Sequence, residues 1–333
     1  MASYGYSELL LLTDSHSMVS TFFIICPIFA LIFSGWLLRY KGWVGDQATT
    51  ELNKFVVFLA LPALLFDIVS TSEWKQLWRP EFISAFLLAT AVLFTLTLLF
   101  QLNRGRVLAD ASIDALNSSY ANTGFMGFPI LLAIVGEESQ TYALSATIIT
   151  VCILFAISII LIECGCNSGK SQRNIAKTVL KKVSSNPIIV APFIAAIVPI
   201  FDLHLPQFLG ESLDLLGGAA APCALVTIGL FLGGGKTKNA KSFLTKRTIA
   251  FVFTKLIIHP TLVLIVVSSL FSLSDTALLC IVLLSALPTG TGPFMVAEYY
   301  RRECTLTSDV ILLSTVLSPL TLALLVYFFQ LNS

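Results

Sequence analysis

The stretch NTGFMGFP, residues 122–129, interrupts an apolar run that is long enough to cross a membrane. A second stretch, ALPTGTGP at residues 286–293, interrupts another such run, and Pro129 and Pro293 lie 164 residues apart, close to half of the 333-residue chain. A broken helix in lipid leaves backbone N–H and C=O groups without partners, so it persists only where it is buried in protein or lines a wet cavity. Paired breaks of this kind point to the binding site of a secondary transporter.

Composition indicates a membrane protein. Apolar residues make up 56% of the chain and charged residues 12%, with a mean hydropathy of +0.88, whereas a soluble domain has roughly 25% charged residues. No basic face is large enough to neutralise phosphates, which excludes nucleic acid as a partner. Residues 1–17 lack the basic region of a cleavable signal peptide, so we expect the first span to direct insertion. The seven cysteines include no CxxC pair, and we expect buried or reduced thiols and no metal site.

A window of about 20 residues, the length that crosses the hydrocarbon core, predicts ten spans. They lie near residues 18–38, 52–71, 81–102, 111–136, 140–162, 187–203, 212–234, 247–271, 276–300 and 306–329. The fourth and ninth spans contain the two breaks. The predicted fold is therefore an all-α integral membrane protein.

The loop charges predict the orientation of these spans. Two basic residues, Lys75 and Arg79, fall on one side, and sixteen fall on the other. Because basic loops stay in the cytoplasm, this predicts a multi-pass cell-membrane protein with both termini outside. The sixteen are Arg39, Lys41, Arg104, Arg106, Lys170, Arg173, Lys177, Lys181, Lys182, Lys236, Lys238, Lys241, Lys246, Arg247, Arg301 and Arg302.

The ten spans divide into two halves of five, residues 1–163 and 187–333, joined by a basic loop at 164–186. An odd number of spans in each half makes the halves inverted relative to each other. Pro62 lies in the second span of the first half, and Pro222 lies in the second span of the other half. The two breaks likewise lie in the fourth span of each half. In the joining loop, the apolar stripe of Ile175, Val179, Leu180 and Val183 indicates either a short helix on the inner membrane surface or an extension of the sixth span.

The breaks predict an anion site. Proline favours the first position of a helix, so Pro129 and Pro293 are predicted to start the second half-helices. Each start presents free N–H groups and the positive end of a helix dipole, about half a unit charge. Gly124, Gly127, Gly290 and Gly292 would allow close backbone approach or a positive φ. Asn122, Thr123, Thr289 and Thr291 would orient a substrate, and the carbonyls that end the first half-helices near Ala121 and Leu287 would hold a cation or a proton.

Four segments resemble a known family. NTGFMGFP (122–129) and ALPTGTGPFMVAEYY (286–300) are similar to the fourth-span and ninth-span motifs of the auxin efflux carrier family, which includes plant PIN-type auxin carriers and bacterial malate or malonate carriers. LNKFVVFLALPALLFDIVST (52–71) and GGAAAPCALVTIGLFLG (217–233) resemble its second and seventh spans. The resemblance covers nearly the whole chain, and the four segments together are specific for this family.

This resemblance implies a scaffold of spans 1, 2, 6 and 7, with a homodimer through the scaffold as one arrangement, and a transport domain of spans 3–5 and 8–10. Spans 4 and 9 would cross at Asn122 and Pro288, where an elevator-like movement would carry an organic anion. Ala121 stands where plant relatives usually have proline, and Asp67 where they have histidine, so auxin itself is not carried over as the substrate. The short central loop resembles that of the bacterial members.

Ionisable residues inside spans are costly and are usually functional or paired. We expect Asp114 and Lys255 to lie within reach of each other, either as a coupling site for H⁺ or Na⁺ or as a structural ion pair. Asp67 is a further coupling candidate, although a wetted position at the end of its span is the simpler interpretation. For His259 we expect a hydrogen bond to nearby backbone rather than a proton relay.

The sequence thus predicts a secondary active transporter of small organic anions, namely monocarboxylates or dicarboxylates. We expect it to use no organic cofactor and to be no enzyme. A sensor or a channel built on the same fold is the alternative. An intramembrane enzyme would need a positioned nucleophile and base, and Ser118, Ser119 and His259 are the only candidates.

Overall fold

The computed structural model describes residues 26–71, 78–167, 180–181, 184–203, 205–234 and 244–332. Every regular element in these ranges is a helix, and the only β-type pairing there is one isolated bridge. Residues 1–17, the stripe at Ile175, Val179 and Val183, and several basic loop positions lie outside the described residues. Those positions are Lys75, Lys170, Arg173, Lys177, Lys182, Lys236, Lys238 and Lys241.

Six helical segments are long and apolar enough to cross a membrane, which confirms the all-helical membrane class. They are Ala48–Thr71, Pro80–Asn103, Glu137–Cys166, Gln207–Gly233, Lys246–Leu270 and Cys304–Phe329. Four shorter apolar helices overlap the ranges predicted for the first, fourth, sixth and ninth spans: Cys26–Tyr40, Thr123–Ile134, Pro187–Ile200 and Asp275–Ala286.

Several of the long segments change helix type along their length. The labelled elements of the first half are α2 (Ala48–Phe55), η1 (Val56–Ala60), α3 (Leu61–Thr71), α5 (Pro80–Asn103), α6 (Leu108–Ser119), η2 (Thr123–Gly127), α7 (Phe128–Ile134), η3 (Glu137–Ser139), α8 (Gln140–Thr147), η4 (Ile148–Leu154) and α9 (Phe155–Cys166). Those of the second half are α11 (Pro187–Ala195), α12 (Ile197–Ile200), α13 (Gln207–Gly218), α14 (Ala220–Gly233), α15 (Lys246–Phe253), η5 (Thr254–Ile258), α16 (His259–Leu270), α17 (Asp275–Ala286), α18 (Gly292–Tyr299) and α19 (Cys304–Asn332).

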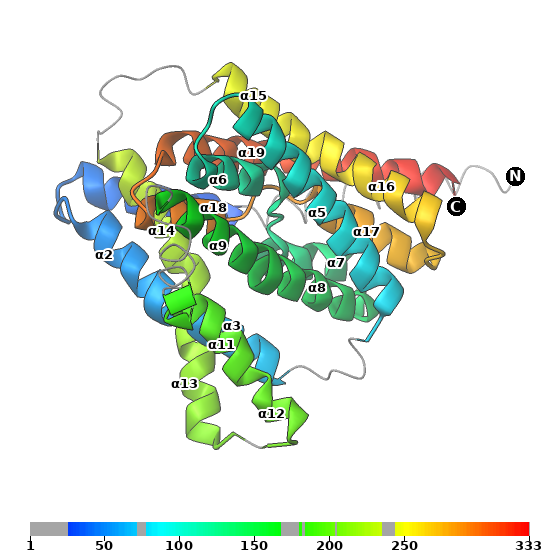
Figure 1. Ribbon diagram of the computed structural model, residues 1–333, viewed down its shortest axis with the longest axis horizontal. Helices are drawn as coiled ribbons and strands as arrows, with labels where there is room; N and C mark the ends of the chain where they lie inside the picture. The colour runs from blue at the N-terminus through cyan, green and yellow to red at the C-terminus, as the bar shows by residue number, and fades with distance from the viewer. Residues whose placement is uncertain are drawn as a thin grey trace, which may run out of the picture.

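The helices pack in two groups. In the first group, α3 packs against α11 and α13, and α2 packs against α14. The helix Cys26–Tyr40 joins this group by direct backbone contact, because a Cβ on Gly229 would lie 2.0 Å from the carbonyl oxygen of Ile32. In the second group, α5 packs against α6 and α16, α16 against α17, and α15 and α17 against α19. Figure 1 shows α2, α3, α11 and α13 on one side of the molecule and α5, α16 and α17 on the other.

Three of the predicted basic loops meet at one end of the second group. Arg106 follows α5, Arg247 begins α15, and Glu303 precedes α19, and both arginines contact the Glu303 carboxylate, at 3.1 and 3.3 Å. These three loops were predicted to lie on the same, basic side of the membrane, and their meeting at one end fits that prediction. We call this end of the molecule the basic end.

Candidate functional site

The two predicted breaks lie against each other. Helix α6 ends at Ser119 and α17 ends at Ala286. The amide of Asn122 donates to the carbonyl of Pro288 at 2.9 Å, and the amide of Gly290 donates to the carbonyl of Tyr120 at 3.0 Å. These bonds form a short antiparallel bridge between Ala121 and Thr289. Each break therefore supplies the backbone partners that the other lacks, as an interruption within a bilayer requires.

Thr289 holds the bridge in place instead of facing a ligand. Its hydroxyl donates to the carbonyl of Asn117 at 2.8 Å, and its amide donates to the hydroxyl of Ser314 in α19 at 3.2 Å. The side chain is fully buried. Thr289 thus joins α6, α17 and α19 at the point where α17 stops.

The two second half-helices start differently from each other. Pro293 is in the first turn of α18, as predicted. In the fourth span, however, helical structure resumes at Thr123 with the π-helical turn η2, and Pro129 lies six residues further along, in α7. The prediction that Pro129 starts this half-helix was wrong, because the π-helical turn η2 precedes α7 and runs directly into it.

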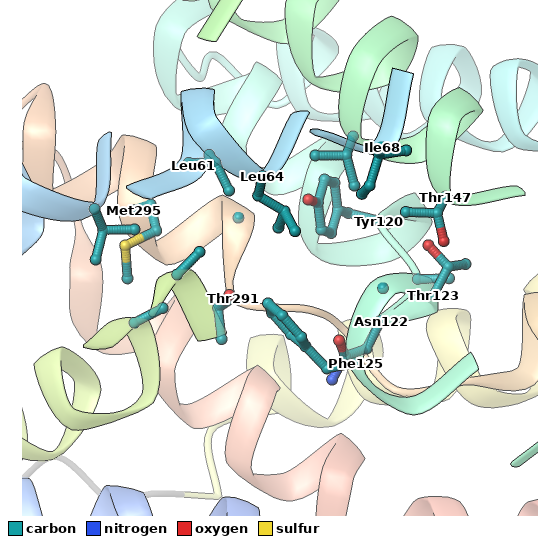
Figure 2. Close-up of a pocket in the computed structure, with 17 residues that line it drawn as sticks. Leu61, Leu64, Ile68, Tyr120, Asn122, Thr123, Phe125, Thr147, Thr291 and Met295 are labelled. Carbon is teal, nitrogen blue, oxygen red and sulfur yellow. The ribbon is translucent and has the colours of Figure 1, made fainter. Parts of the chain in front are cut away.

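A cavity of about 60 Å³ adjoins the bridge, between the two groups of helices. One wall carries apolar side chains of α3 together with Ala220 and Ala224 of α14. The opposite wall is built from residues 120–125 and from Thr291, Gly292 and Met295. Figure 2 shows Leu61, Leu64 and Ile68 facing the side chains of Asn122, Phe125 and Thr291 across this space.

The polar groups around this cavity are uncharged, and several are unpaired. Among the described residues, no hydrogen bond involves the side chain of Tyr120, Asn122 or Thr291, and the buried hydroxyl of Thr123 has no partner. First-turn amides of a helix have no partner within it, and in the described backbone those of Gly124 and Phe125 have none elsewhere. Donors without acceptors and without a nearby carboxylate favour an anion or a polar neutral group.

The glycines of the breaks serve close packing rather than unusual backbone angles. The glycines with positive φ in the described chain are Gly42, Gly105 and Gly136, so the prediction of positive φ at the breaks was wrong. A Cβ on Gly292 would lie 2.7 Å from Cζ of Tyr120, and one on Gly290 would lie 2.9 Å from Cε1 of the same ring. Gly290 and Gly292 therefore make room for Tyr120, which rests on their backbone.

The remaining predicted binding residues surround the cavity without lining it. Pro288 and Gly290 form the bridge. Gly127 packs against Leu284, where a Cβ would lie 3.1 Å from the leucine Cδ2. Pro129 and Pro293 lie in the half-helices. The structure thus brings five of the predicted residues to the cavity surface: Asn122, Thr123, Gly124, Thr291 and Gly292.

Tyr120 is a lining residue that sequence reasoning did not select. It lies at the end of α6, and its ring packs against Phe155 with the centroids 5.7 Å apart. An aromatic residue directly before a break was the available signal, but an apolar run gives many aromatic residues the same appearance. Thr147 and Met295 were missed for a similar reason, since they lie in regular helix.

Asp114 and Lys255 do not pair, contrary to the prediction. The Asp114 carboxylate lies 3.3 Å from Nε of Arg106 and 3.2 Å from Nη2 of Arg247, at the basic end. Its side chain is 3% exposed. A buried carboxylate requires such partners, and this one ties α6 of the first half to α15 of the second. The prediction failed because Arg106 lies in the loop before α6 and Arg247 in the first turn of α15, and a search for charges deep inside the spans leaves out residues at their ends.

Lys255 instead covers the end of α17. Its ammonium donates to the carbonyl of Ser285 at 2.6 Å and lies 3.1 Å from Nδ1 of His259, and it is fully buried. Nε2 of His259 lies 3.5 Å from the hydroxyl of Thr90, so this histidine has side-chain partners in place of the predicted backbone bond. Because the last carbonyls of a helix carry its negative dipole end, Lys255 places a hydrogen-bond donor at the position where the sequence predicted a bound ion.

Asp67 lies away from the cavity, in the last turns of α3. Its backbone carbonyl accepts the hydroxyls of Ser70 and Thr71. Asp67 is also close enough to Asp214 of α13 to feel its charge. Two acids on neighbouring helices of the first group thus lie near each other.

Comparison with known proteins adds an independent result. Residues 21–326 match the family described as "Membrane transport protein". A protein of Rhizobium meliloti named "Putative malonate transporter" is 28% identical over 91% of this chain and 94% of its own length. "Auxin efflux carrier component 8" of Arabidopsis thaliana is 24% identical over 92% of this chain and 96% of its own length. "Uncharacterized transporter YfdV" of Escherichia coli is 26% identical over 84% of this chain and 89% of its own length.

Proposed function

The chain belongs to the membrane transport protein family, which confirms the resemblance to the auxin efflux carriers, and on that premise we propose that it is a secondary active transporter of small carboxylates. The observation that carries the proposal is the set of unpaired donors around the cavity at the bridge. Tyr120, Asn122 and Thr123 from one half of the chain face Thr291 from the other half there. The name of the Rhizobium meliloti relative refers to malonate, a small dicarboxylate, which supports this substrate class.

Asn122 has the central role in this proposal. Its amide N–H anchors the bridge to Pro288, so its backbone is fixed, while its side-chain amide remains free at the cavity surface. A fixed backbone with a free NH₂ group suits a carboxylate oxygen, because the donor is already oriented when the ligand arrives. The first-turn amides of Gly124 and Phe125 and the adjoining helix dipole add to the same electrostatic preference.

Movement is part of the proposal, because a substrate held between the two groups of helices must reach both sides of the membrane in turn. The first group of helices would be the scaffold, and the second group, with α6, α7, α17 and α18, would carry the substrate in an elevator-like movement. The ten spans would form two inverted repeats, residues 1–163 and 187–333, with the basic end in the cytoplasm of a cell membrane. A homodimer through the scaffold stays a prediction.

Coupling to an ion also stays a proposal. Asp114, Lys255 and Asp67 are the candidates, and H⁺ and Na⁺ are the candidate ions. Lys255 favours H⁺ over Na⁺, because its ammonium occupies the carbonyl end of α17 that a metal cation would use. No organic cofactor and no enzymatic step enter this scheme.

A binding experiment tests the proposed site. We expect thermal-shift titration of the purified protein with malonate and related mono- and dicarboxylates to show stabilisation. Asn122→Ala should weaken that binding at least tenfold, because it removes the free donor. Asn103→Ala, which makes the same change at the exposed end of α5, is the matched control. Equal affinities in the two variants would place the carboxylate site elsewhere.

A transport assay then separates a carrier from the alternatives. Reconstituted protein should take up a radiolabelled carboxylate with saturation at the affinity measured by binding. Binding without uptake would identify a sensor, and ionic currents far above carrier rates would identify a channel.

A further inference from the structure

A second hollow lies at the outer flank of the second group, away from the bridge. It has a volume of about 1230 Å³ and runs between α5 on one side and α15 and η5 on the other. Helix α5 packs closely against α16 but makes few contacts with α15, so the helices diverge toward the basic end. Figure 1 shows α5 and the yellow α15 on the same flank of the molecule. We call this hollow the flank groove.

The walls of the flank groove are apolar along most of its length. Leu96, Leu99, Phe100 and Ile258 contribute large side chains that are 40 to 58% exposed. Such side chains on a membrane-spanning surface face lipid tails, which are as apolar as they are. The walls therefore suit an acyl chain that lies parallel to α5.

The basic end of the flank groove carries four cations, and two of them are not neutralised. Arg106 and Arg247 share the carboxylates of Asp114 and Glu303. In the described part of the chain, Lys246 and Arg104 have no ion pair, and the guanidinium of Arg104 rests over the Phe100 ring at 5.1 Å. Two positive charges therefore remain available at the end of an apolar groove.

A buried polar atom lies deeper along the flank groove, toward the bridge. Ser118 contributes to the floor of the flank groove, is fully buried, and its hydroxyl has no hydrogen-bond partner in the described structure. A buried hydroxyl without a partner is unfavourable, so Ser118 marks a polar point in the otherwise apolar lining, near the end of α6.

We propose that the flank groove binds one anionic phospholipid from the leaflet at the basic end. Its acyl chain would lie along Leu96, Phe100 and Ile258, and its phosphate would lie between Arg104 and Lys246. Basic pockets between membrane helices on the cytoplasmic side bind anionic headgroups by this combination of charge and apolar surface. The proposal does not depend on the carboxylate site, which lies on the other side of α6.

The test uses the full-length protein in a neutral detergent, titrated with phosphatidylglycerol or with phosphatidylcholine of the same acyl chains. We expect phosphatidylglycerol to raise the melting temperature and native mass spectrometry to retain one such lipid. Removing both free charges in the Arg104→Ala/Lys246→Ala double variant should weaken this binding about 30-fold. The Lys41→Ala/Lys181→Ala double variant removes two exposed charges outside the flank groove and should bind like the wild type.

Two further arms keep the result interpretable. Ala250→Trp fills the flank groove while leaving its charges, and should also abolish retention of the lipid. Glycerol 3-phosphate, the headgroup without chains, should give no stabilisation. The proposal is overturned if phosphatidylcholine stabilises as well as phosphatidylglycerol, if the Arg104→Ala/Lys246→Ala protein binds like the Lys41→Ala/Lys181→Ala protein, or if glycerol 3-phosphate alone reproduces the effect. Melting temperatures without lipid identify any variant that fails to fold.

Discussion

Replacing Gly292 with alanine tests how the bridge shapes the cavity. The new Cβ would lie 2.7 Å from Cζ of Tyr120, 2.9 Å from its hydroxyl and 3.0 Å from Cε1. Ordinary contact begins near 3.4 Å, so the ring must move by about 0.7 Å. It cannot retreat freely, because it packs against Phe155. The Tyr120 ring therefore moves toward the cavity, whose volume is only about 60 Å³.

The size of the effect follows from these distances. Overpacking a tight site costs about 1 to 3 kcal/mol in stability. A ring displaced into the cavity should also lower carboxylate affinity at least tenfold, which is about 1.4 kcal/mol of binding free energy. Gly124→Ala is the matched comparison, because its Cβ would meet only Cγ2 of Thr147, at an ordinary 3.7 Å. Alanine is the better helix former, by about 1 kcal/mol, so Gly124→Ala should keep or raise the melting temperature.

Thermal unfolding in detergent measures the first effect, and the malonate titration measures the second. We expect Gly292→Ala to melt below the wild type and Gly124→Ala to melt at or above it. If both variants melt alike, or if Gly292→Ala binds malonate with wild-type affinity, then Tyr120 is not confined by this glycine and the account of the bridge is wrong.

Two further predictions concern the charged residues. Asp114→Asn should lower the melting temperature, because Arg106 and Arg247 lose one of the two carboxylates that they share, and a hydrogen bond to a charged group contributes about 1.5 to 3 kcal/mol. Uptake driven by an imposed pH or sodium gradient then shows whether Asp114 also couples, and unchanged coupling would remove it from the mechanism. Carboxylate uptake by the wild type should be the same in sodium and in choline buffer, because the Lys255 ammonium occupies the end of α17, and a strict sodium requirement would contradict that assignment.

The sequence predicted the breaks well because glycine and proline act locally. Their positions specify where a helix must stop, whatever packs around it, and α6 and α17 end within two residues of the predicted points at Ala121 and Leu287. The helical class was equally accessible, since it follows from hydropathy alone. What these local signals did not contain was the direction in which each side chain points after the break.

The residues that were predicted incorrectly depend on contacts between distant segments. Thr289 and Thr291 have the same chemistry and lie two positions apart, yet the first is held by Asn117 and Ser314, while the second faces the cavity. Asp114 meets Arg247, which is 133 positions away in the sequence. No periodicity or propensity encodes such a pairing, and a two-residue shift of register at the bridge would place Thr291 where Thr289 now lies.

The contacts that close the cavity show what a transport movement would have to break. Asn53 of α2 donates to the carbonyl of Met295 at 3.1 Å, and Thr50 donates to the Glu298 carboxylate at 2.9 Å. Met295 lines the cavity at the bridge, and Asn53 lines a larger hollow of about 610 Å³ that lies at the basic end. The Asn53 bond therefore stands between the two spaces.

The cost of opening this barrier is small compared with the free energy of even weak binding. A neutral hydrogen bond contributes about 1 kcal/mol and one to a charged group about 1.5 to 3 kcal/mol, whereas a ligand with a millimolar dissociation constant supplies about 4 kcal/mol. A ligand shifts a conformational equilibrium only by its difference in affinity for the two states. The donors of Tyr120, Asn122 and Thr291 have no protein partners in the closed arrangement, so a carboxylate that reached them after the barrier opened would supply that difference, and release of the substrate would let the Asn53 and Thr50 bonds form again.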